Sequence, residues 1–260
     1  MTDHNNEPRD EASYNLDDGE FAGLSFSYIR SLASILSAAL LAIGAITAPW
    51  GMVVVVILFG SLLIIGWTTL LNLPNRSTAH SALGIVFLLL VAAGIWGSMV
   101  LTALVAAFGI VVVFIAEMLR PANAFRRLEQ IAGTYLGITL LTALSLWIHT
   151  SYLTDGIKVT VMMTLIIAVV SVIHAFPTRS LEFVSLLNGI VAGIAAALIL
   201  ALPWWSGVLV GFAVPTSFQL TRRAVTDIFR AGKILPNIAR IFVPISALGM
   251  VALAVGLILD

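Results

Sequence analysis

Long apolar stretches alternate with short polar segments along most of the chain. Four of these stretches cover residues 29–72, 81–118, 131–174 and 184–219. One helix needs about 20 apolar residues to cross a bilayer, so each stretch is long enough for two crossings. Turn-forming residues interrupt each stretch near its middle, at Pro49-Trp50-Gly51, Gly97-Ser98, 149–158 and 203–207. With a final apolar segment at 241–259, the pattern predicts an all-α, polytopic transmembrane helical bundle of about nine spans.

Composition places the chain in the membrane class. Hydrophobic residues make up 60% of the 260 residues and charged residues 10%, whereas about 25% of residues are charged in soluble domains. There is no cysteine, which excludes disulfides, thiol catalysis and thiolate metal sites. Seven of the 13 acidic residues lie in the first 20 positions. We therefore predict a disordered acidic cytoplasmic tail over residues 1–27, either a solvated leader or a regulatory segment, and a transmembrane domain over 28–260.

The distribution of positive charge predicts the orientation. With the N-terminus in the cytoplasm, 12 of the 13 basic residues fall on inner segments, and Lys158 alone falls on an outer turn. The positive-inside rule then predicts a multi-pass protein of the cell membrane with a cytoplasmic N-terminus and an outer C-terminus. Tryptophan prefers the bilayer interface, and five tryptophans fall at the predicted outer turns: Trp50, Trp96, Trp147, Trp204 and Trp205.

Two segments of the sequence resemble each other. Residues 62–77 (LLIIGWTTLLNLPNRS) align with residues 165–180 (LIIAVVSVIHAFPTRS), and both enter a Pro-x-Arg-Ser turn. One interpretation is a parallel duplication of four spans, with halves at 28–118 and 131–219 and a final helix at 241–259. The other is that apolar helices entering the cytoplasm tend to end alike. Both interpretations remain open.

Pairs of glycines four residues apart predict close helix packing. They occur at Gly133/Gly137, Gly189/Gly193 and Gly207/Gly211. Small residues at this spacing let helix backbones approach one another in lipid, where packing drives association. The same property makes helix-mediated oligomerisation a candidate for this chain.

Ionisable residues near the spans are the candidates for function, because charge inside a bilayer is costly and usually has a role. Glu117 lies near the inner end of the fourth span beside Arg120, and His174 precedes the second Pro-x-Arg-Ser turn. Pairing with Arg120 and a purely structural histidine are the respective alternatives. The arginines of the inner loops are candidates for binding a substrate or an anionic lipid head group, or serve orientation alone: Arg76, Arg179, Arg222 and Arg223.

Motifs for metal, cofactor or nucleic-acid chemistry are missing from the sequence. The acids outside the N-terminal segment are scattered singly, and no phosphate-binding glycine loop or nucleophile with a base is present. We therefore expect no metal, no cofactor and no nucleic-acid partner. Residues 218–233 mix aromatic and aliphatic residues with arginines, a composition typical of a helix lying on anionic lipids of the inner leaflet.

The segment Ser217-Phe-Gln-Leu-Thr-Arg-Arg, followed by Leu235-Pro236, resembles the phosphatidate cytidylyltransferase (CDP-diacylglycerol synthase) family, which is also polytopic. In that family a serine precedes a Lys-Arg pair, a Lys-Asp pair and a Leu-Pro-x-His-Gly-Gly segment ending in Asp-Arg-x-Asp. Arg222 and Arg223 occupy the places of the first basic pair. The Lys-Asp pair, the His-Gly-Gly segment and the metal-binding aspartates are missing. The resemblance implies a lipid-binding frame without the family's metal-dependent catalysis.

These features favour a permease-like transporter of a small or amphipathic molecule over an enzyme. Two alternatives stay open: a degenerate relative of lipid head-group enzymes, and a non-catalytic membrane scaffold. The expected partners are anionic lipids of the inner leaflet and a small molecule whose identity the sequence does not specify.

Overall fold

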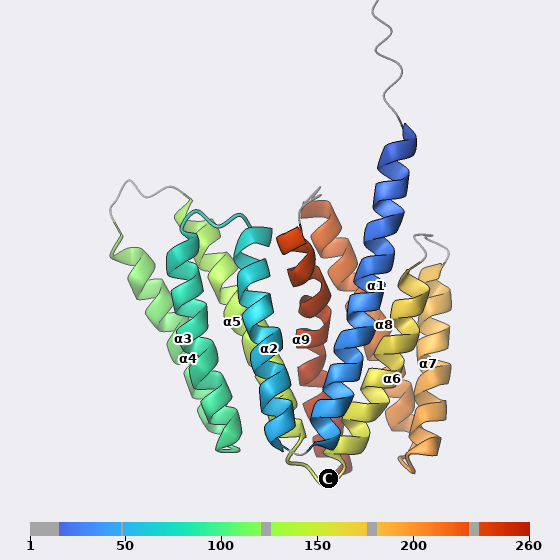
Figure 1. The fold of residues 1–260 in the computed structure, drawn as a ribbon. Helices are drawn as coiled ribbons and strands as arrows, with labels where there is room; N and C mark the ends of the chain where they lie inside the picture. The colour runs from blue at the N-terminus through green and yellow to red at the C-terminus, as the bar shows by residue number, and fades with distance from the viewer. Residues whose placement is uncertain (1–15, 48, 121–125, 176–180, 229–233) are drawn as a thin grey trace, which may run out of the picture.

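The protein is an all-α bundle (Figure 1). The computed structural model describes residues 16–47, 49–120, 126–175, 181–228 and 234–260. Within these ranges nine helices alternate in direction: α1 (Leu16–Ile46), α2 (Pro49–Leu70), α3 (Arg76–Ile95), α4 (Met99–Met118), α5 (Arg127–Thr150), α6 (Gly156–His174), α7 (Leu181–Ile199), α8 (Trp204–Ile228) and α9 (Ile234–Leu259). The four predicted hairpin turns are confirmed, each within a few residues of the expected position.

Eight of these helices are long and apolar enough to cross a membrane, so the chain is a multi-pass integral membrane protein. The exception is α8, whose second half carries Gln219, Arg222, Arg223 and Asp227. It nevertheless lies beside α6 and α7 in the bundle (Figure 1) and packs closely on α7. We call the end of the bundle with the α2–α3 and α4–α5 connections the arginine end, and the opposite end the tryptophan end.

Helix α1 begins earlier than the sequence indicates. Residues 16–27 are helical rather than part of an unstructured tail, and α1 projects beyond the other helices at the arginine end (Figure 1). Residues 1–15 lie outside the described residues.

The predicted surface helix over residues 218–233 is part of α8 as far as Ile228, and residues 229–233 lie outside the described residues. Helix α8 continues without a break through Phe218 to Ile228, despite an internal proline at Pro215. Helix α9 begins at Ile234, seven residues before the predicted start. Arg222 and Arg223 therefore lie on the continuation of α8 rather than on a separate helix.

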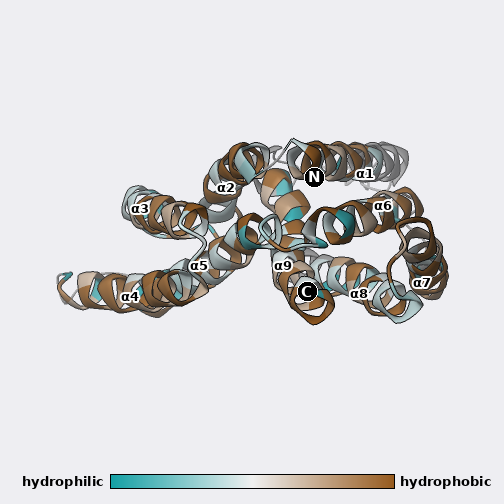
Figure 2. Cartoon of the chain, turned by 90° about the horizontal axis from the view of Figure 1, so that it is seen from below, coloured by the Kyte–Doolittle hydropathy of each residue, from teal (hydrophilic) through white to brown (hydrophobic). Residues whose placement is uncertain are grey.

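Seen along the helix axes, the bundle is elongated (Figure 2). Helices α3 and α4 lie at one side and α7 at the other, with α5 and α9 between them. Helix α9 contacts α2, α5, α6 and α8, while α1 packs mainly on α6. The two predicted repeat halves are therefore interleaved in space, because α1 lies with α6 and α5 lies with α3 and α4. Whether the halves arose by duplication stays a prediction.

Trp147 does not belong to the interfacial tryptophans. Trp50, Trp96 and Trp204 are more than 60% exposed at the tryptophan end, as predicted, but Trp147 is fully buried. Its indole Nε1 donates a hydrogen bond to the Ile245 carbonyl oxygen at 3.2 Å and so joins α5 to α9. Position along the sequence places Trp147 near an interface, but the packing of α5 against α9 covers it.

The glycine pairs of α7 and α8 face each other. A Cβ atom at Gly193 would collide with the backbone carbonyl of Gly207, and one at Gly207 with that of Gly193. The same holds for Gly189 and Gly211. The predicted close packing is thus confirmed here, and it places α8 directly against α7.

We predict that Gly193→Ala destabilises the protein, because the new methyl group forces α7 and α8 apart. Overpacking of this kind costs about 1–3 kcal/mol, so the midpoint of thermal unfolding in detergent should fall. The matched control is Gly84→Ala in α3, where a Cβ atom meets nothing within 4 Å. This control should unfold at the same temperature or higher, since alanine favours helix by about 1 kcal/mol over glycine. Equal unfolding temperatures for the two variants would contradict the packing argument.

Candidate functional site

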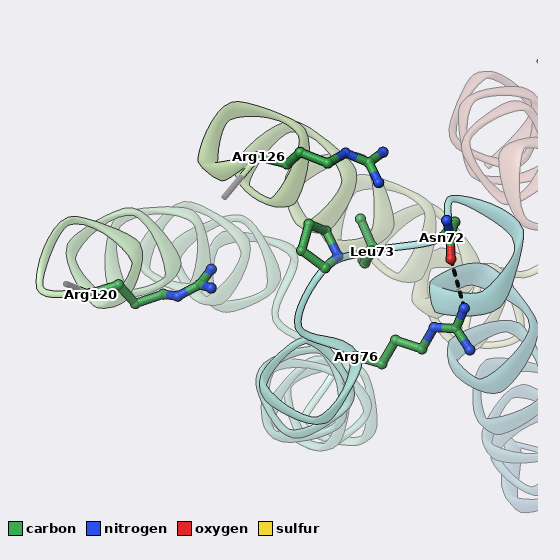
Figure 3. A pocket seen from close by; sticks show the side chains of 6 residues that line it. Asn72, Leu73, Arg76, Arg120 and Arg126 are labelled. Carbon is green, nitrogen blue, oxygen red and sulfur yellow. Dashed lines mark hydrogen bonds between the residues drawn. The ribbon is translucent and has the colours of Figure 1, made fainter. Parts of the chain in front are cut away.

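An open pocket of about 600 Å³ lies at the arginine end (Figure 3). Three arginines line it: Arg76 at the start of α3, Arg120 just after α4, and Arg126 just before α5. The three side chains surround the α2–α3 turn at Leu73 (Figure 3). We call this site the arginine pocket, and its lining residues are Asn72, Leu73, Pro74, Arg76, Arg120 and Arg126.

The α2–α3 turn is shaped by asparagine side chains. Asn72 adopts a left-handed conformation (φ 46°), which asparagine tolerates better than most residues. Its side-chain Oδ1 accepts a hydrogen bond from the Arg76 guanidinium at 2.7 Å. Asn75 caps α3 by accepting a hydrogen bond from the Thr78 backbone N–H at 3.2 Å. These contacts set where Arg76 leaves the helix.

Backbone strain is concentrated at the arginine pocket. The described residues include three non-glycine positions with positive φ, Asn72, Arg126 and Ala201, and the first two line the pocket. The left-handed conformation of Arg126 (φ 55°) costs about 1–2 kcal/mol for a residue with this side chain. Such strain persists where surrounding contacts hold it, and it is common at functional sites.

Gln130 connects the α2–α3 turn to the first turn of α5. Its side chain is almost fully buried, with 1% exposed. The amide Nε2 donates to the Asn75 carbonyl and the Oε1 accepts from the Asn75 N–H, both at 3.1 Å. Arg127 makes a second connection by donating to the Arg120 carbonyl oxygen at 2.5 Å. The first turn of α5 therefore fixes the turn before Arg76 and the end of α4 at Arg120.

Two of the three pocket arginines form ion pairs on their own helices. Arg120 contacts the Glu117 carboxylate at 2.6 Å, and Glu117 is 3% exposed. Arg126 pairs with Glu129, which is half-exposed. The hydrogen bond to Glu129 raises the pKa of the Arg126 guanidinium above its ordinary value. Among the described residues Arg76 has no carboxylate partner, and it donates instead to the neutral amide of Asn72.

The charges of the arginine pocket thus leave an excess of one positive charge. Arg76, Arg120 and Arg126 contribute three cations, and Glu117 and Glu129 balance two of them. Guanidinium groups donate several hydrogen bonds in a plane and suit carboxylate or phosphate oxygens. The arrangement can therefore bind an anion, with Arg76 as the cation that no carboxylate neutralises within the described part of the chain.

Comparison with protein-family models, with curated proteins and with solved structures found no match. The resemblance of residues 217–236 to CDP-diacylglycerol synthases therefore stays a prediction. No group of three histidine, aspartate or glutamate side chains that could hold a metal ion occurs among the described residues. The chemistry of the site rests on its own side chains.

The other predicted site residues lie elsewhere. His174 ends α6, where its Nε2 and the Ser185 hydroxyl are 3.2 Å apart and its ring stacks on Phe218. Arg223 in α8 is ion-paired with Glu182 of α7. Arg222 lies in α8 but its side chain is outside the described residues, as is all of Arg179. Of the predicted residues, Arg76 therefore lines the arginine pocket and Glu117 adjoins it through its ion pair with Arg120, while His174 and Arg223 lie at the α6–α8 side of the bundle.

Sequence reasoning did not select Arg120, Arg126, Asn72 or Gln130. Arg120 and Arg126 belong to a basic segment at 118–130 whose composition is similar to that of residues 218–233, but nothing in it distinguishes them from charges that only set the orientation. The burial of Gln130 is a tertiary property, because its partner Asn75 is 55 residues away. In the sequence Gln130 stands directly before the apolar stretch 131–174, and that position alone does not indicate burial.

We predict that Gln130→Leu destabilises the arginine end, because it leaves the Asn75 N–H without its side-chain partner, while the Asn75 carbonyl keeps its hydrogen bond from the Ala79 N–H. An unsatisfied buried polar group costs about 1–3 kcal/mol, and thermal unfolding in detergent should report the loss. Gln219→Leu is the matched control, since Gln219 donates a single hydrogen bond, to the Glu182 carbonyl, and is only part-buried. A larger loss for the control than for Gln130→Leu would contradict the connecting role of Gln130.

Proposed function

We propose that this membrane protein is a permease for an amphipathic anion, which it binds in the arginine pocket. The observation that supports the proposal is the excess positive charge of a pocket built from three helix ends. Exposed leucines are near two of its arginines in the sequence: Leu119, which precedes Arg120, and Leu128, two residues after Arg126, are each 81% exposed. A ligand with a charged head and an apolar body fits such a boundary between cations and lipid.

Binding fits this pocket better than catalysis does. The two carboxylates beside it, Glu117 and Glu129, are both held in ion pairs with arginine. A carboxylate whose oxygens are engaged by a neighbouring guanidinium is not placed to take a proton from a bound substrate. The enzyme reading also drew on Arg222 and Arg223, and Arg223 is engaged with Glu182 away from the pocket. A non-catalytic scaffold would need no such pocket, and a protein that retains no ligand would support that alternative.

Native mass spectrometry of the purified full-length chain tests ligand binding. We expect the wild type to retain an anionic molecule, and Arg76→Gln to lose most of it. A charge-assisted hydrogen bond contributes about 1.5–3 kcal/mol, or roughly 10- to 100-fold in affinity. Arg223→Gln is the control, because it removes a cation outside the pocket and should keep the molecule. A wild type that retains nothing, or retention equal in both variants, would support the scaffold instead.

Movement across the membrane is tested in proteoliposomes loaded with the molecule released from the wild type. We expect efflux that depends on the protein and is slowed in Arg76→Gln but not in Arg223→Gln. Vesicles that bind the molecule at their surface without releasing it from the lumen would overturn the permease and leave the binding site.

We also propose that the arginine end faces the cytoplasm of a cell membrane, which places the N-terminus inside. The absence of native cysteine allows a direct test with single-cysteine variants. Ser77→Cys lies at the exposed start of α3 at the arginine end, and Thr154→Cys lies at the exposed tryptophan end. In intact cells a membrane-impermeant maleimide should label Thr154→Cys alone. Labelling of Ser77→Cys alone would reverse the orientation.

A further inference from the structure

We infer that the ligand of the arginine pocket carries a phosphoryl group, with Arg76 as its first contact; this inference rests on the proposed binding site. The number and origin of the cations support it. A planar carboxylate is satisfied by one bidentate arginine, whereas a tetrahedral phosphoryl group presents oxygens in several directions. Arg76, Arg120 and Arg126 come from three different helix ends around one pocket.

Arg76 differs from the other two arginines in its partner. Its guanidinium donates to the neutral Oδ1 of Asn72, so an anion gains a full charge interaction without displacing a carboxylate. Arg120 is held by the almost fully buried Glu117, and Arg126 by the half-exposed Glu129. Of these two, the Arg126 pair is the weaker competitor, because water screens an exposed ion pair. A phosphoryl group bound first by Arg76 would next compete with Glu129 for Arg126.

The hydrogen bonds that position the backbone around the pocket are consistent with binding first by Arg76 and then by Arg126. Gln130 fixes the turn that carries Asn72 and leads into Arg76, and it lies in the same helical turn as Arg126. The backbone positions from which the two binding arginines extend are thus fixed relative to each other by the hydrogen bonds of Gln130. Preorganised cations of this kind bind an anion without the cost of first assembling the site.

Two substitutions should change phosphoryl binding in opposite directions. Arg76→Gln should weaken binding roughly 10- to 100-fold, as expected for one charge-assisted hydrogen bond. Glu129→Gln should strengthen it about two- to fivefold, because it frees Arg126 from an exposed ion pair. A purely structural role of these residues would not produce opposite signs. The matched control is Glu182→Gln, which frees Arg223 at the α7–α8 contact outside the pocket and should leave binding unchanged.

The binding measurement uses the full chain in a maltoside detergent, with inorganic phosphate, acetate and a short-chain phosphatidate as probes in separate titrations. We expect phosphate or phosphatidate to bind at least tenfold more tightly than acetate, with a detectable rise in the unfolding temperature. Tighter binding of phosphatidate than of phosphate identifies a lipid head group as the source. Tighter binding of inorganic phosphate identifies a soluble phosphorylated ligand.

Three results would overturn the inference: acetate binding as tightly as both phosphorylated probes, Arg76→Gln and Glu129→Gln shifting affinity in the same direction, or Glu182→Gln reproducing the gain of Glu129→Gln. With any of these results, the proposed permease function still stands if the wild type retains another anion and moves it across the membrane. Conversely, a protein that binds phosphate with the expected variant effects but moves nothing across vesicles retains the phosphoryl site and loses the transport function.

Discussion

Two hydrogen bonds from buried tryptophan indoles hold α5 in the bundle, and the rest of the structure depends on them. Trp67 of α2 donates to the Gly133 carbonyl at 2.9 Å, and Trp147 of α5 donates to the Ile245 carbonyl of α9 at 3.2 Å. In a bilayer no water is available to replace a lost partner, so each bond fixes a helix pair in register. Gly137 makes room for the Trp67 ring, and Gly133 makes room for the side chains of Leu71 and Leu73. The position of α5 then brings Arg126, Arg127 and Gln130 to the α2–α3 turn and the end of α4.

The sequence predicted the order of elements better than their neighbours. Hydropathy varies along the chain, so the hairpin turns at Pro49, Gly97 and Pro203 could be located from the residues alone. Lateral contacts leave no comparable pattern, because an apolar residue facing lipid and one facing another helix look alike in a bilayer protein. Trp147 shows the consequence: its place near a turn predicted an interfacial ring, and only the contact with α9 makes it core. The glycine pairs were the exception, since a missing side chain indicates close approach directly.

The candidate site was predicted in part for the same reason. Arg76 and Glu117 were identified because charge at the end of an apolar span is conspicuous. Their association through Arg120 depends on α3, α4 and α5 meeting at one end, which the sequence does not record. His174 and Arg223 were equally conspicuous, yet they contact Ser185 and Glu182 at the α6–α8 side. Charge therefore identified candidate residues, and only the three-dimensional packing decided which of them share a pocket.

The balance of charge in the arginine pocket suits the proposed permease, which would have to release what it binds. Three unpaired guanidiniums at a membrane surface would repel one another and hold a multivalent anion tightly. Glu117 and Glu129 remove two of these charges, which stabilises the empty site and limits the affinity of the filled one. A transport site has to bind well enough to be occupied and weakly enough to empty. One unneutralised arginine beside two that can be recruited from their carboxylates meets both requirements, and it does so without a charged group in the middle of the membrane.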